Sequence, residues 1–176
     1  MKNALICKAI IGISIALLFS SCAGYNLEGR GSVLPTHILR VGVPTLENNT
    51  NLPSLGEIIT REIYSEFINR SSFQVLSTDS GVDAVLEGEI ISYVLIPRAL
   101  DEEGVATSFL ISVTANMAFR DLIEDTILWE QENYNFRREY QLSDISGDFV
   151  TQELESIRLA AKDFANSLVS SILSGF

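Results

Sequence analysis

The chain has little of what most catalytic and metal sites require. Its 176 residues include two cysteines and one histidine, His37. Cys7 lies in an N-terminal apolar stretch, so Cys22 is the only cysteine that follows it. A single cysteine excludes an intramolecular disulfide and a cysteine-based zinc site. A lone histidine is far more often structural than a ligand or a base. We therefore expect a structural His37, and no metal or other cofactor.

Positive charge is also scarce, with 12 Lys and Arg against 23 Asp and Glu. Nucleic acids and anionic lipids select for clustered basic residues, so we expect neither as an electrostatic partner. The sequence also has no glycine-rich phosphate loop and no nucleophile–base pair. It therefore predicts a protein that is not an enzyme. A lipid-anchored hydrolase is an alternative that no motif supports.

The N-terminal segment has the pattern of a bacterial lipoprotein signal. Lys2 and Lys8 precede an apolar run of about eleven residues, which is too short to span a bilayer. Two serines then lead into Cys22, as in a lipobox, in which the cysteine becomes the acylated first residue. Two or more acyl chains make membrane anchoring stable. The alternatives are an ordinary secretory signal or an uncleaved anchor. Ala23 in place of Asp favours the outer membrane, by the sorting rule of enterobacterial lipoproteins.

Cleavage before Cys22 leaves 155 residues with a net charge of about −13, which is enough for one domain with a real core. We expect a signal peptide at 1–21 and a lipid-anchored tether at 22–36, rich in glycine. The domain is expected at 37–176.

Hydrophobic periodicity predicts a β-α-β opening, a three-stranded meander and a final helix. Ser54 and Glu57 have capping-box spacing at the start of a helix that should end near Asn69. Pro97 should end the first long strand and begin a loop at 98–104. The apolar stripes predicted for the two helices are Leu55, Ile59, Ile63 and Phe67, and Leu154, Ile157, Ala161, Phe164, Leu168 and Ile172.

These elements predict an α+β fold. Two amphipathic helices and a one-faced sheet can bury their apolar surfaces only against each other. We expect a two-layer sandwich, with a mostly antiparallel four- to five-stranded sheet and both helices on one face. The other face is then either a docking surface or a solvated face with a loop over its apolar end. By parity it carries Glu87, Glu89, Ser112, Thr114 and Asn116, with Ile91, Tyr93 and Leu95.

Four segments resemble the LptE family of lipopolysaccharide-assembly lipoproteins. Cys22–Leu27 is similar to the family's Cys-Gly-Tyr-x-Phe/Leu start. Val41–Thr50 is similar to its I-x-V-P-x-F-x-N-x-T strand and loop, with Leu46 in place of Phe. Asp83–Ile90 resembles its A-D-x-V-L-x-G-x-I strand, and Thr126–Glu130 its x-V-L-W-E strand. The resemblance covers most of residues 22–176, and the family fold is also a sheet with two helices on one face.

The resemblance implies an outer-membrane lipoprotein that plugs the lumen of the LptD β-barrel and contacts lipopolysaccharide. Guanidinium groups suit phosphates, so Arg98, Arg137 or Arg138 is a candidate contact for the head group. Arg137 and Arg138 should point to opposite faces of their strand. Alternatively, these arginines balance surrounding carboxylates. A second candidate function is a periplasmic scaffold or transport-accessory lipoprotein, because domains like the N-terminal domain of TolB share a β-α-β opening.

Overall fold

The computed structural model describes residues 34–104, 106–141 and 149–175. Cys22, the expected signal peptide and most of the expected tether lie outside the described residues. Helix α2 spans Leu55–Arg70 and helix α3 spans Phe149–Ser174. In the part of the chain that the structure describes, no helix is long and apolar enough to cross a membrane.

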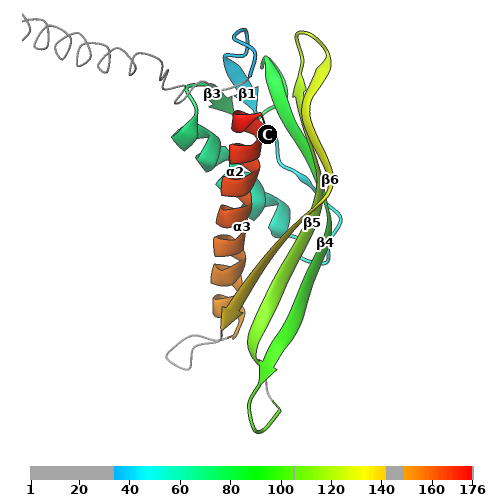
Figure 1. The fold of residues 1–176 in the computed structure, drawn as a ribbon, viewed down its shortest axis with the longest axis vertical. Coiled ribbons are helices and arrows are strands. Elements are labelled where there is room, and N and C mark those ends of the chain that lie inside the picture. The colour runs from blue at the N-terminus through cyan, green and yellow to red at the C-terminus, as the bar shows by residue number, and fades with distance from the viewer. Residues whose placement is uncertain (1–33, 105, 142–148, 176) are drawn as a thin grey trace, which may run out of the picture. The chain divides into compact units, whose positions relative to one another are not determined.

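The strands of the described residues form one mixed sheet of six strands, in the order β3-β1-β4-β5-β6 with β2 beside β4 (Figure 1). They are β1 Arg40–Gly42, β2 Glu47–Asn48, β3 Gln74–Leu76, β4 Ala84–Leu100, β5 Ala106–Asp121 and β6 Thr126–Gln141. The three long strands are antiparallel, but β1 runs parallel to β3 and β4, and β2 runs parallel to β4. The prediction of a mostly antiparallel sheet of four to five strands was therefore wrong in two respects: the sheet has six strands, and its short strands pair in parallel. A helical crossover, α2, separates β1 from β3, and such a connection lets neighbouring strands run parallel.

Both helices cover the same face of the sheet, as predicted (Figure 1). The predicted stripe of α2 is fully confirmed, because all four of its residues are buried. The stripe of α3 is confirmed except at Leu154, which is 51% exposed. The largest fully buried side chains come from both layers: Phe67, Phe119, Phe164, Ile38, Leu55, Ile59, Ile63, Leu86, Ile90, Ile111, Met117 and Leu168.

Aromatic side chains join the long strands to the helices. Phe164 of α3 lies edge-on to Tyr134, with ring centroids 5.2 Å apart. Phe67 of α2 stacks on Phe119 of β5 at 6.1 Å. The indole N–H of Trp129 donates to the hydroxyl of Ser171 at 3.0 Å. These contacts fix which sheet face is covered, and so which face stays open.

The predicted capping box does not form. Ser54 is the N-cap of α2, but it has helical backbone angles, φ −77° and ψ −8°, and its side chain makes no capping hydrogen bond. A capping serine normally has extended backbone angles that aim its oxygen at the N–H groups of the first turn. The spacing of Ser54 and Glu57 predicted the start of the helix correctly, but the predicted capping hydrogen bond of Ser54 is absent.

A β-bulge at Ile91 reverses the faces predicted for the second half of β4. Ile90 pairs with Ala115, but Ser92 pairs with Thr114, so one extra residue is accommodated between them. Tyr93 therefore points toward the helices, where its hydroxyl donates to Glu153 at 3.0 Å. Leu95 packs on the core as well, so neither lies on the side of Glu89. Val94 takes the opposite side and is 44% exposed. A bulge of this kind is invisible to a strict period of two.

Strand β4 also runs past Pro97 to Leu100, so Arg98 lies in a strand and not in the predicted loop. Beyond Ile90, β4 pairs only with β5 among the described strands. The register shifts again between Pro97 and Ala99. Proline is tolerated on edge strands and at bulges, where no ladder hydrogen bond is lost.

Candidate functional site

The sheet face opposite the helices carries a mixed set of polar and apolar side chains, which we call the outer face. Of the eight residues predicted for it by parity, five lie there: Glu87, Glu89, Ser112, Thr114 and Asn116. Asn135 links two of them, because its amide donates to the hydroxyls of Ser112 (3.1 Å) and Thr114 (2.8 Å). Strand register places these residues of β4, β5 and β6 on the outer face: Glu87, Glu89, Ser92, Val94, Ile96, Leu110, Ser112, Thr114, Asn116, Ala118, Glu130, Asn135, Arg137 and Glu139.

The half of the outer face nearer β1 is hollowed into an acidic groove with a volume of about 410 Å³. Five carboxylates line it: Glu47, Glu87, Glu89, Glu130 and Glu132. The amide of Asn49 donates to Glu89, and the guanidinium of Arg120 lies 4.0 Å from Glu87. No cluster of His, Cys, Asp or Glu in the described part of the chain has the arrangement of a metal site.

The other half of the outer face is less acidic and partly apolar. Val94 pairs with Ser112, which in turn pairs with Arg137, and Ile96 pairs with Leu110. Val94 and Ile96 are exposed. Figure 1 shows β4 and β5 extending beyond the end of α3 in this direction. The open sheet thus presents carboxylates at one end, and apolar side chains with a guanidinium at the other.

The three candidate arginines do not form one cluster. Arg137 and Arg138 point to opposite faces, as predicted. Arg138 faces the helices and forms an ion pair with Asp163 of α3. Arg137 lies on the outer face, opposite Ser112. Arg98 is exposed at the second irregularity of β4. The charge-balancing alternative thus describes Arg138, whereas Arg137 and Arg98 have no ion-pair partner among the described residues.

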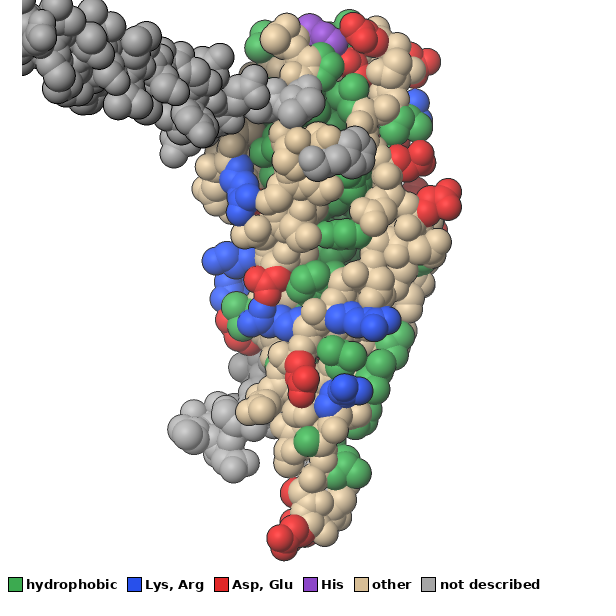
Figure 2. All heavy atoms as spheres, in the orientation of Figure 1, with side chains coloured by type: hydrophobic (Ala, Val, Ile, Leu, Met, Phe, Trp, Pro, Cys, Tyr) green, Lys and Arg blue, Asp and Glu red, His purple; other side chains and the backbone are tan. Residues whose placement is uncertain are grey.

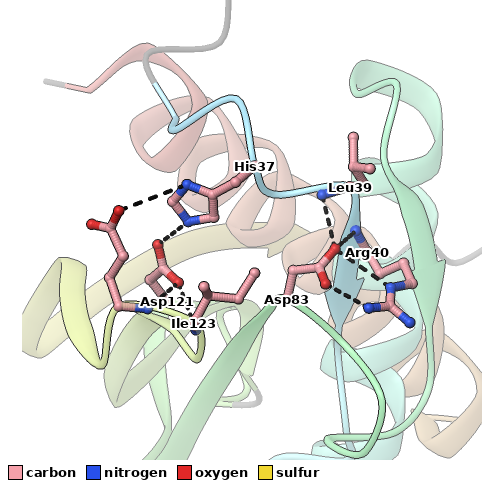
Figure 3. A network of polar contacts seen from close by, with 7 residues as sticks. His37, Leu39, Arg40, Asp83, Asp121 and Ile123 are labelled. Atoms are coloured by element: carbon pink, nitrogen blue, oxygen red, sulfur yellow. Dashed lines mark hydrogen bonds and ion pairs between the residues drawn. The ribbon is translucent and has the colours of Figure 1, made fainter.

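Two buried carboxylates hold the segment through which the chain enters the sheet (Figure 3). Asp121 accepts a contact of 2.5 Å from Nε2 of His37, and also the N–H groups of Ile123 and Glu124. Asp83 accepts the N–H of Leu39 at 3.0 Å. The expected structural role of His37 fits this geometry.

The carboxylate of Asp83 also binds the guanidinium of Arg40. Asp83 accepts the N–H of Arg40 at 2.8 Å and its guanidinium at 2.7 Å. The side-chain hydrogen bond from Arg40, with the N–H of Leu39, lowers the pKa of Asp83 to about 2. Burial alone would raise the pKa of Asp121, but the N–H of Glu124 and His37 outweigh it and lower that pKa. The donors around Asp83 and Asp121 therefore stabilise both carboxylates in the charged form.

Comparison with protein families shows to which family the chain belongs. The sequence model of the LptE family, described as lipopolysaccharide-assembly, matches residues 39–172. The chain belongs to the LptE family. This match confirms the resemblance and spans all six strands and nearly all of both helices. LptE proteins are non-enzymatic lipopolysaccharide-assembly lipoproteins.

Solved structures support the fold. A protein from Xanthomonas campestris, XCC0632, has a TM-score of 0.52 at 10% identity, covering 78% of this chain and 85% of its own. A candidate lipoprotein from Caulobacter crescentus CB15 has a TM-score of 0.50 at 12% identity, covering 74% and 88%. A comparison with curated protein sequences gave no match. At these identities the solved structures establish the architecture alone.

Proposed function

We propose that this LptE-family protein is an outer-membrane lipoprotein that assembles with an LptD-like β-barrel and plugs its lumen. In that position it assists the insertion of lipopolysaccharide into the outer leaflet. The family match over residues 39–172 is the observation that carries the proposal. It favours this function over the periplasmic scaffold with a TolB-like domain.

The open sheet face supports the plug role. The two helices pack on one face of the sheet, whereas the outer face presents hydroxyl, amide and carboxylate groups from three long strands. A hydrophilic barrel interior can hydrogen-bond to such a face without desolvating large apolar patches. Ser112, Thr114, Asn116 and Asn135 offer both donors and acceptors at its centre.

The anchor gives the domain its position. In this proposal residues 1–21 are removed as a signal peptide and Cys22 carries the acyl chains, including palmitate. Residues 22–36 connect the lipid to the domain at 37–176. The protein then lies on the periplasmic side of the outer membrane.

Direct contact with lipopolysaccharide is assigned to the partly apolar half of the outer face. Arg137 is exposed there, and Arg98 is exposed at the second irregularity of β4. Neither has an ion-pair partner among the described residues, so their guanidinium groups can bind phosphates in bidentate fashion. Arg138 is the weakest of the three candidates because Asp163 already binds it.

Affinity purification in mild detergent tests the proposal. We expect one large outer-membrane barrel protein to co-purify with the acylated protein. We also expect depletion of the protein to reduce both the folded barrel and surface lipopolysaccharide. Recovery of soluble periplasmic proteins alone, with surface lipopolysaccharide unchanged, would favour the scaffold function.

A further inference from the structure

The last strand of the sheet has a free edge. Strand β6 pairs with β5 on one side and, within the part of the chain that the structure describes, with no strand on the other. From Asn135 to Gln141 its register with β5 has no irregularity. Alternate residues of an antiparallel edge direct their N–H and C=O groups away from the sheet, and no backbone group of the other described elements binds them. This segment, which we call the β6 edge, is therefore open to another strand.

Other parts of the sheet margin carry features that discourage strand pairing. The free side of β4 beyond Ile90 contains Pro97 and three register shifts. In β6 itself the register shifts beside Asn133, which has a positive φ of 53° and donates its N–H to Asn116. Prolines and bulges are common means by which proteins protect sheet edges. The β6 edge, Asn135–Gln141, has neither.

The β6 edge exposes one side chain of each charge on the outer face. Four of its residues are exposed there: Asn135, Arg137, Glu139 and Gln141. Neither Arg137 nor Glu139 has an ion-pair partner among the described residues, and Glu139 accepts the hydroxyl of Ser108 at 3.4 Å. Arg138 faces the helices, where Asp163 binds it. Figure 2 shows basic and acidic side chains interspersed over the half of the molecule where β6 ends, so charge of one sign does not dominate there.

The spacing of these side chains makes the β6 edge complementary to itself. When two copies of a strand pair antiparallel about a twofold axis, residues equally far from the axis on opposite sides face each other. An axis at Arg138 places Arg137 of each copy opposite Glu139 of the other, which gives two ion pairs. The same register places Asn135 opposite Gln141. An axis at Arg137 or at Glu139 would instead set like charges directly against each other, which is destabilising.

We propose that two copies of this protein pair antiparallel through the β6 edge, with the twofold axis at Arg138. The sheet then continues across both copies, and each copy covers the free edge of the other. The two Arg138 side chains face each other in this register, but Asp163 of the same copy already compensates each of them.

The pair is a form of the protein outside the barrel and goes beyond the proposed function. A lumen that holds one copy requires the two copies to separate. Arg137 is engaged by Glu139 of the second copy in the pair, so pairing and a contact of Arg137 with a lipopolysaccharide phosphate exclude each other.

Sedimentation of the full acylated protein in mild detergent tests the pairing through charge reversal. Arg137→Glu and Glu139→Arg each replace both ion pairs with like charges, and we expect each to weaken dimerisation roughly tenfold. The double variant restores both ion pairs with reversed sign and should dimerise like the parent. Glu102→Arg makes the same charge change as Glu139→Arg at an exposed residue outside the β6 edge. It is the matched control and should leave dimerisation unchanged.

A disulfide tests the register. Directly opposed residues of an antiparallel pair have Cα atoms about 4.5–5.5 Å apart, which is within the range that a disulfide spans. Arg138→Cys should therefore give a disulfide-linked dimer on mild oxidation of the acylated protein, in which the acyl chain occupies the thiol of Cys22. Ser112→Cys, on the neighbouring strand β5, is the matched control and should stay uncrosslinked.

Two results would overturn the inference. A parent protein that sediments as a monomer at every concentration does not pair at all. A dimer that is equally stable in both single charge variants, or that Arg138→Cys does not crosslink, uses a surface other than the β6 edge. Neither result bears on the plug function, which co-purification of a barrel protein tests separately, and absence of a barrel partner would leave the pairing of the β6 edge intact.

Discussion

The Nε2 atom of His37 lies 2.5 Å from Oδ2 of Asp121, whose carboxylate has no exposed surface. This contact joins the segment before β1 to the end of β5, 84 residues away in the chain. The same carboxylate receives the N–H groups of Ile123 and Glu124. One buried anion therefore fixes both the entry of the chain and the β5–β6 turn.

Replacing Asp121 with Asn should destabilise the domain by about 1–3 kcal/mol, because the buried acceptors of three donors are weakened. The pKa of Asp121 is lowered in the fold, so this contribution is present near neutral pH and is lost as the pH falls through the folded pKa. Urea unfolding measures the loss. Asp125→Asn, in the exposed turn of the same hairpin, is the matched control and should change little. Equal stability of the two variants would show that the buried carboxylate is unimportant.

Because the pKa of Asp83 is lowered in the fold, we expect the stability of the domain to fall at acid pH. Its pKa is about 2 in the fold against an ordinary value of 3.8, so the unfolded chain takes up the proton first as the pH falls. The stabilising contribution of Asp83 is complete above about pH 4 and disappears toward pH 2. Thermal melts of Asp83→Asn should therefore lie below the parent at pH 7 and converge with it near pH 2. The exposed Asp79→Asn should follow the parent at every pH, and a parallel offset of the Asp83 variant would contradict the assignment.

Phe164 joins α3 to the sheet. Its ring lies 5.2 Å from that of Tyr134 and 6.2 Å from that of Phe136, and it is fully buried. Phe164→Ala should cost about 3–5 kcal/mol, as large-to-small core substitutions do. The exposed Leu154→Ala on the same helix should remain within about 0.5 kcal/mol of the parent in urea unfolding.

Sequence periodicity predicted both helices, the meander, the α2 stripe and the opposite faces of Arg137 and Arg138. It failed at Ile91 because a single bulged residue shifts the side chains that follow it, up to the next irregularity at Pro97, to the other face of β4. It also missed the parallel half of the sheet, since β1, β2 and β3 are too short to show a period. The roles of Asp83 and Asp121 carried one weak signal: each is a charged residue at the boundary of an apolar strand, where buried polar groups are usually hydrogen-bonded.

Substitutions of the candidate arginines should distinguish a structural role from a role in binding lipopolysaccharide. Arg138→Ala should cost about 0.2–1 kcal/mol, the usual range for a partly exposed ion pair, and should leave lipopolysaccharide binding unchanged. Arg137→Ala, alone or with Arg98→Ala, should leave stability unchanged and weaken binding of lipopolysaccharide. Binding of dephosphorylated lipopolysaccharide should not respond to these substitutions. If all three variants bind like the parent, the arginines have no role in the contact.

The plug function requires that the outer face contact a barrel protein, and photocrosslinking in living cells identifies the partner of this face directly. A photoreactive residue at Ser112 or Asn116 should give an adduct with a single large outer-membrane barrel protein. The same residue at Tyr134, which packs against α3, should give little or none. Adducts from Ser112 and Asn116 with soluble periplasmic proteins alone would contradict the plug function.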